Sequence, residues 1–428
     1  MKPATAPDVS GQLRRARFSA ATVFFYQAFL IASWASRIPQ IKAATGLSDG
    51  MFGLALLSAP LAGIAAMRPV SRMVARLGSK RLIRVSLIPY AALTILLADA
   101  RNGLWLTIAL ACIGAVGDAL NVSMNAQGVE VERGYGRPQM NGLHACFSAG
   151  GLVGALLGSL AADAGFSPPR HIAAAAVAAA LLCLGATGGL MPRAAGRPAG
   201  QPAADAPRRP AGLRPSRRLA GRLPGRELWI LGAIVFCLLL SEGAMDDWSA
   251  LFLRDSLGAT AATAPLGYAM FSLAMTAGRT AGNRVVAVLG PVTAVRCGAG
   301  LAAVSLSIGL SSHSPVIAIA GFGFFGLGTC VIAPTAFSAA GNTQGITAGS
   351  AIATVSAIGY LGLFVGPGLI GSVAQMSGLA VALGIPAGLA ASIVLLAPAV
   401  SHASGARSLR RGSRSAPPTR IDRDYETL

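Results

Sequence analysis

Apolar stretches long enough to cross a membrane recur along this sequence from residue 18 to residue 400, separated by short polar breaks. A helix needs about 20 apolar residues to cross the roughly 30 Å hydrocarbon core of a bilayer. Only 12% of the residues are charged, about half the share in soluble domains. We therefore predict an all-α membrane protein. The twelve predicted transmembrane helices cover residues 17–37, 49–70, 80–99, 103–129, 140–163, 169–191, 227–253, 263–286, 290–311, 315–340, 346–374 and 377–400.

Basic residues gather in alternate breaks between these helices. They concentrate before residue 18 and in 68–84, 130–137, 192–226, 279–296 and 401–423. Arg and Lys are retained in cytoplasmic loops, so one orientation places all of these segments, and both termini, in the cytoplasm. The net charge of +19 follows this loop pattern, and we expect no nucleic-acid partner.

The predicted helices divide into two groups of six. We expect an N-terminal half over 1–191 and a C-terminal half over 227–400. Residues 192–226, rich in Pro, Gly, Ala and Arg, have the composition of a flexible linker. Residues 401–428 are expected to form a disordered cytoplasmic tail.

An internal repeat relates the two halves. The segments "SRMVARLGSKRLIR" (71–84) and "NRVVAVLGPVTAVR" (283–296) lie 212 residues apart, and each follows the second helix of its half. Parallel repeats of this kind form secondary transporters that bind solute between the halves. We expect gating roles for residues in and beside these loops, namely Arg72, Arg76, Gly78, Arg84, Arg279, Arg284 and Gly290.

The first of these loops resembles that of major facilitator superfamily (MFS) transporters, whose pattern is Gly-x-Leu-Ala-Asp-Arg-x-Gly-Arg-Arg/Lys. Arg76, Gly78 and Lys80 match it, whereas Ser71 and Ala75 replace the first Gly and the Asp. The stretches "FFYQAFLIASWASRIPQIK", "NVSMNAQGVEVE", "MNGLHACFSAGG", "EGAMDDW" and "GRTAGNR" resemble the fucose-permease-like branch and bacterial inner-membrane proteins of unassigned substrate. The resemblance implies the MFS fold, alternating access and the bacterial cytoplasmic (inner) membrane.

Polar side chains in the first predicted helix are candidates for a substrate or proton pathway. Gln27 falls near the midplane, while Trp34 and Arg37 lie toward the outside. Trp34 could stack on a sugar-like or ring-bearing solute. The alternative is an interfacial Trp beside a snorkelling Arg.

The fourth and fifth predicted helices supply further candidates. Asp118, Asn121 and Asn125 share one stripe of the fourth helix. A carboxylate at this depth must face a cavity, find a partner or be protonated. Asn125 has the alternative of a hydrogen bond between helices. His144 in the fifth helix is a candidate proton relay, with a structural hydrogen bond as the alternative.

The stretch "SEGAMDDWSALFLRD" (241–255) places four of the chain's 16 acidic residues at the end of one helix. Glu242 and Asp246 lie one turn apart, and we assign the pathway to them over Asp247 and Asp255. Trp248 ends this helix as Trp34 ends the first.

The eighth predicted helix carries Tyr268, a substrate candidate, and Arg279, which we expect to be structural or gating. In fucose permease, acids in the first and fourth helices are tied to proton coupling. The matching positions here are Ala35 and Asn121, so that pair is absent, and Asp118 lies one turn away as a substitute.

These features predict a secondary active transporter of a small polar solute, driven by protons. Sugar-like uptake and export of a metabolite or drug both remain open. An ion-independent facilitator would share the fold, as would a non-transporting sensor or scaffold. The sequence shows no nucleophile–base pair, HExxH motif or CxxC motif, so we expect no enzyme activity, cofactor or metal. We expect a monomer in the lipid bilayer.

Overall fold

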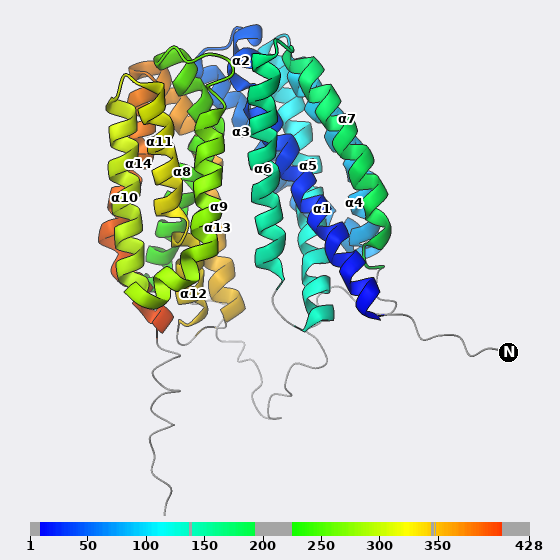
Figure 1. The fold of residues 1–428 in the computed structure, drawn as a ribbon. Helices are drawn as coiled ribbons and strands as arrows, with labels where there is room; N and C mark the ends of the chain where they lie inside the picture. Colours follow the sequence, from blue (N-terminus) through cyan, green and yellow to red (C-terminus); the bar gives the residue numbers. More distant parts are fainter. Residues whose placement is uncertain (1–8, 137–138, 193–224, 344–345, 347, 405–428) are drawn as a thin grey trace, which may run out of the picture.

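The computed structural model describes residues 9–136, 139–192, 225–343, 346 and 348–404, and these are almost entirely helical (Figure 1). The N-terminal group comprises α1 (Val9–Ala35), α2 (Ile38–Thr45), α3 (Asp49–Leu77), α4 (Ser79–Ala98), α5 (Gly103–Tyr135), α6 (Met140–Asp163), α7 (Pro168–Ala186) and the 3-10 turn η1 (Thr187–Gly189). The C-terminal group comprises α8 (Arg226–Leu251), the π-helical turn η3 (Phe252–Ser256), α9 (Leu266–Leu289), α10 (Pro291–Ser311), α11 (Pro315–Thr329), α12 (Ile332–Gly341), α13 (Ala348–Ser377), α14 (Leu379–Leu396) and the 3-10 turn η4 (Ala397–Ser404).

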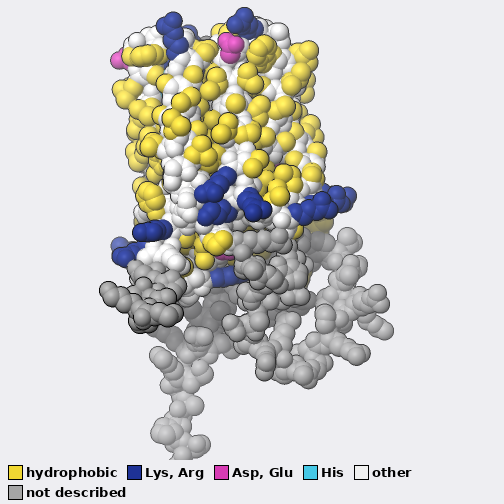
Figure 2. Space-filling view, turned by 90° about the vertical axis from the view of Figure 1, so that its right-hand side faces the viewer, with side chains coloured by type: hydrophobic (Ala, Val, Ile, Leu, Met, Phe, Trp, Pro, Cys, Tyr) yellow, Lys and Arg dark blue, Asp and Glu magenta, His cyan; other side chains and the backbone are white. Residues whose placement is uncertain are grey.

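Eleven spans in the described residues are long and apolar enough to cross a membrane, with α11 and α12 counted as one. The 24-residue helix α9 runs beside them. Figure 2 shows the corresponding outer wall, hydrophobic along its length with Lys and Arg gathered at its two ends. The predicted all-α membrane architecture is confirmed, and among the described residues eleven of the twelve predicted spans meet these criteria.

Several helix ends differ from the predicted ones. Helix α1 begins at Val9, before the apolar window, and α3 continues to Leu77 through Pro60 and Pro69. The predicted tenth helix is interrupted, since α11 ends at Thr329 and α12 begins at Ile332, whereas α5 is continuous over 33 residues.

The helices form two bundles, α1–α7 and α8–α14, that lie side by side (Figure 1). Residues 193–224 of the predicted linker and 405–428 of the predicted tail lie outside the described residues.

The two repeat loops share one backbone conformation. Gly78 between α3 and α4 has φ 80° and ψ 153°, and Gly290 between α9 and α10 has φ 79° and ψ 158°. Positive φ values of this size favour glycine, which has no Cβ to clash with the backbone. The repeat predicted from sequence therefore extends to backbone geometry.

Helices α3 and α13 join the bundles by close backbone contact at the end that carries α2, which we call the distal end. A Cβ atom added at Gly53 would lie 2.5 Å from the carbonyl oxygen of Pro367 and 2.9 Å from the Cα of Gly371. The ring of Phe52 meets that of Trp248 edge-on, with centroids 5.7 Å apart. Small residues thus allow the two backbones to touch, as in other membrane helix pairs.

Polar contacts also join the bundles at the distal end. Lys42 pairs with Asp49 in its own half, and its Nζ lies 3.5 Å from an oxygen of Asp255 in the other. The Gly50 amide donates to Gln375 Oε1 at 3.3 Å. Ser159 Oγ donates to the Ala262 carbonyl at 2.5 Å. We refer to the Lys42, Asp49 and Asp255 cluster as the distal latch.

Candidate functional site

The acidic face of α8 meets a cation from α9. Nη2 of Arg279 lies 3.5 Å from Oε1 of Glu242, and their side chains are 41% and 20% exposed. Asp246, one turn further along α8, lies in the electrostatic field of Glu242, Asp247 and Arg279. Ionisable side chains within membrane-spanning segments are costly, which makes this pair a candidate functional site.

Tyr268 extends this group toward the other half. Its hydroxyl group lies in the electrostatic field of Asp246. A Cβ atom added at Gly151 of α6 would lie 3.3 Å from the Tyr268 hydroxyl oxygen and 3.6 Å from Ser272 Oγ. Helices α6 and α9 therefore approach each other at this polar pair, and glycine on α6 permits the approach.

The other two acids of the 241–255 stretch, Asp247 and Asp255, have different surroundings. Asp247 is half-buried next to Asp246. Asp255 is exposed in η3 and belongs to the distal latch. The preference for Glu242 and Asp246 over Asp247 stays a prediction.

The first half contributes His144 and two amides. His144 of α6 is exposed, and its ring packs edge-on against that of Phe24, with centroids 5.2 Å apart. The charge of Arg279 acts on His144 from the other half. On α5, Asn125 donates to Oδ1 of Asn121 at 2.9 Å. Asn121 is itself exposed, so an amide accessible from outside the protein lies within a membrane span.

Gln27 and Asp118 lie deeper in the first half. Gln27 is buried and donates from Nε2 to the Gly117 carbonyl at 3.0 Å, while its Oε1 atom is buried without a partner. Asp118 is half-buried and faces Gly63 of α3, and its buried Oδ2 atom also lacks a partner. Both side chains therefore present unused acceptors inside the first bundle.

The structure places the remaining pathway candidates in distal packing and does not bring them to the Glu242–Arg279 pair. Trp34 is 8% exposed, and Trp248 is fully buried against Phe52. Arg37 is 1% exposed and donates to the backbone carbonyls of Gly158 and Phe166.

Apart from Arg279, the gating candidates lie in or beside the α3–α4 and α9–α10 loops, at the end of the bundles opposite the distal end. Arg84 Nε donates to Oγ1 of Thr187 at 3.0 Å. The remaining arginines of the repeat loops, Arg72, Arg76 and Arg284, are exposed.

The contacts made by three side chains, those of Lys80, Gln127 and Lys42, were not predicted from the sequence. Lys80 Nζ donates to the Leu190 carbonyl at 2.8 Å, and Gln127 Nε2 donates to the Met191 carbonyl at 3.0 Å. Lys80 and Gln127 thus connect α4 and α5 to the segment that follows η1. Lys42 makes comparable connections at the distal end. A single cation or amide near a helix end carries no pattern that identifies such a contact in the sequence.

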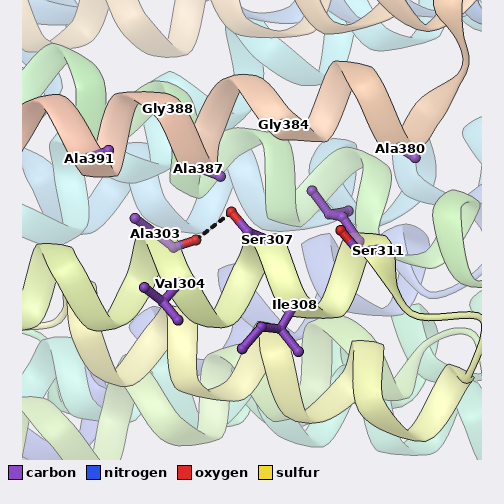
Figure 3. Close-up of a pocket in the computed structure, with 11 residues that line it drawn as sticks. Ala303, Val304, Ser307, Ile308, Ser311, Ala380, Gly384, Ala387, Gly388 and Ala391 are labelled. Carbon is purple, nitrogen blue, oxygen red and sulfur yellow. Dashed lines mark hydrogen bonds between the residues drawn. The ribbon is translucent and has the colours of Figure 1, made fainter.

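A groove of about 530 Å³ lies apart from these residues, between α10 and α14 (Figure 3). Its lining is small or aliphatic, with two serines, and includes Val304 and Ile308, which are 58% and 57% exposed. Ser307 Oγ donates to the Ala303 carbonyl at 2.8 Å. No lining residue is charged, so the groove offers no counterpart to the acids of α8.

Comparisons with known proteins agree with this architecture. Residues 18–252 match the family model of the Major Facilitator Superfamily. The chain is 34% identical over 404 residues to an uncharacterized MFS-type transporter of Yersinia pestis, a match that covers 93% of this chain and 98% of that protein. It is 29% identical over 361 residues to membrane protein MosC of Rhizobium meliloti, covering 84% of each.

Two solved structures share the fold at low sequence identity. The nucleoside transporter NupG has a TM-score of 0.65 at 11% identity, covering 90% of this chain and 98% of that one. A bacterial homolog to the human lysosomal transporter Spinster has a TM-score of 0.63 at 16% identity, covering 97% and 100%. The matched family, the Yersinia pestis relative and both solved structures are transporters and not enzymes. This chain therefore belongs to the major facilitator superfamily and is a multi-pass membrane transporter.

Proposed function

We propose that this protein is a secondary active transporter that moves a small polar solute by alternating access. The observation that carries the proposal is the half-exposed Glu242–Arg279 pair within the spans. Tyr268 continues this group to the contact with α6. Asn121 and His144 supply polar groups from the first half. A solute held by both halves would change sides when they rock about it.

The distal contacts support a conformation that is closed at that end. Loop charge assigns the distal end to the outside of the bacterial cytoplasmic membrane and both termini to the cytoplasm. In the proposed domain organisation, residues 1–191 and 227–400 form the two halves, 192–226 form a cytoplasmic linker and 401–428 form a cytoplasmic tail. Opening to the outside then requires the distal latch and the Gly53–Gly371 contact to separate.

Proton coupling is the drive that we propose, with Asp118, Glu242 and Asp246 as carriers. Each is a half-buried carboxylate in a membrane span. Such a group can bind a proton on one side of the membrane and release it on the other. A sugar-like solute is in keeping with the resemblance to fucose permease, with Tyr268 as its contact in the site. Import and export are both compatible with this arrangement.

The first test identifies a ligand and the second tests coupling. The purified chain is screened by thermal shift against sugars, nucleosides, amino acids and organic acids. A hit is then followed as a radiolabelled solute in proteoliposomes, with and without a proton gradient. Gradient-driven flux that disappears in the Asp118→Asn, Glu242→Gln double variant supports coupling. Flux that is the same with and without the gradient identifies a facilitator, and a ligand that binds without any flux overturns transport.

A further inference from the structure

Arg37 is a buried cation that pairs with no acid in the described part of the chain. It lies between α1 and α2 at the distal end and is 1% exposed. Its Nη1 atom lies 3.4 Å from the Gly158 carbonyl oxygen, Nη2 donates to the Phe166 carbonyl, and buried Nε has no partner. None of the four ion pairs among the described residues includes it.

A second buried polar side chain lies beside it. His171 of α7 is 7% exposed, and neither Nδ1 nor Nε2 has a hydrogen-bond partner. Arg37 and His171 both meet Gly158, since a Cβ atom added there would lie 3.5 Å from His171 Cε1. The charge of Arg37 also acts on His171. At least one ring nitrogen of any imidazole carries a hydrogen, so each residue has an unused donor.

The local charge is one-sided. His171 lies in the first turn of α7, where the helix dipole places partial positive charge. Three acids at the same end of the bundles do not pair with Arg37, because Asp49 and Asp255 contact Lys42 and Asp163 is exposed. A buried guanidinium with a free donor and no counter-ion is strongly disfavoured. An anion would use both donors and offset the charge.

We propose that Arg37 and His171 bind a small monovalent anion such as chloride. A single guanidinium balances one negative charge. The dipole of α7 adds a favourable field for an anion, while Pro168 and Pro169 at its first two positions have no N–H to donate. The site lies within the first half and is distinct from the Glu242–Arg279 region, so it does not rest on the proposed transport function.

The test is the thermal stability of the purified full chain in sodium chloride or bromide against sodium gluconate at equal ionic strength. We expect the halides to raise the melting temperature of the wild type in a saturable way, by roughly 2 to 5 °C. His171→Leu removes the imidazole donor and should abolish the rise. His171→Gln keeps a donor and should retain part of it. His313→Leu, at an exposed histidine between α10 and α11 in the other half, should respond as the wild type does.

A second measurement locates the ion. Crystals grown in bromide should show an anomalous peak between Arg37 and His171 in the wild type and none in Arg37→Lys, which retains the charge but lacks the Nε donor. Equal melting temperatures in halide and gluconate for the wild type would overturn the proposal. An unchanged halide response in His171→Leu would do so as well, since the anion would then bind elsewhere.

Discussion

Nη2 of Arg279 lies 3.5 Å from Oε1 of Glu242, which makes a cation and an anion neighbours inside two adjacent membrane spans. The two side chains are 41% and 20% exposed, so the pair is not enclosed by the protein. Exposed pairs contribute about 1 kcal/mol or less to stability. The pair therefore contributes little to the stability of the fold, and we attribute its location within the spans to function.

Glu242→Gln should therefore impair transport far more than stability. The variant removes the carboxylate and leaves Arg279 unpaired, so we expect initial transport rates to fall at least tenfold. Stability should change by about 1 kcal/mol or less. Flux in proteoliposomes and thermal unfolding measure the two effects. Asp163→Asn, at an exposed acid at the end of α6, is the matched control. Wild-type flux in Glu242→Gln would remove this residue from the mechanism.

Lys42→Met should shift the protein toward a conformation open at the distal end. The latch is partly exposed, with Lys42 at 13% and Asp255 at 42%. Its loss should weaken closure by about 1 kcal/mol and change the ratio of closed to open molecules about fivefold. Spin labels at Ala164 and Ser311 in a cysteine-free background report the distance between the halves.

The control for the latch is Arg101→Ala. It breaks the 3.7 Å pair of Arg101 and Asp99, which lies within one half. The distance distribution should stay at that of the parent. If both variants widened it equally, general loosening and not the latch would be responsible.

Gly53→Leu should prevent distal closure while preserving each bundle. A Cβ atom at this position would meet the backbone of Pro367 and Gly371 in the other half, at 2.5 and 2.9 Å. Backbone cannot move aside as a flexible side chain can. We expect transport to fall at least tenfold and the distal spin-label distance to lengthen. Gly185→Ala, where an added Cβ meets nothing within 4 Å, should transport normally. Normal flux in Gly53→Leu would show that this contact need not close.

Gly78→Ala and Gly290→Ala should destabilise the protein by similar amounts, about 1 to 2 kcal/mol each. The two glycines have φ values of 80° and 79°, and a Cβ atom added at Gly290 would meet nothing within 4 Å. Backbone strain at positive φ therefore opposes both substitutions. Gly300→Ala, in open space inside α10, should gain up to about 1 kcal/mol through helix propensity. Unequal costs at Gly78 and Gly290, measured by unfolding, would contradict the shared geometry.

The sequence predicted the membrane architecture because hydropathy reports the partition of each segment into lipid, which depends on local composition. The repeat at Gly78 and Gly290 was visible for a related reason. A position that requires positive φ favours glycine, so the requirement is visible in the residue type at that position.

Contacts between distant segments were less predictable. Helical spacing gave a shared face for Glu242 and Asp246, but Arg279 was assigned to gating and not to a pair with Glu242. Spacing also grouped Arg37 with Gln27, whereas Arg37 is buried against α6 and the loop before α7. Periodicity identifies one face of a helix but not the neighbour that covers it.

The interruption between α11 and α12 has no counterpart in α5, the matching helix of the first half. The repeat offset of 212 places Asp118 opposite Cys330, since 118 + 212 = 330. Asp118 lies inside the unbroken helix α5, while Cys330 lies in the break and contacts Gly278 of α9. One half therefore carries its carboxylate within a continuous helix, and the other has a break of two residues in the helix at the matching position. A bend at this break would move the inner end of the second half without moving its distal end, so the two bundles would contribute differently to a change of conformation.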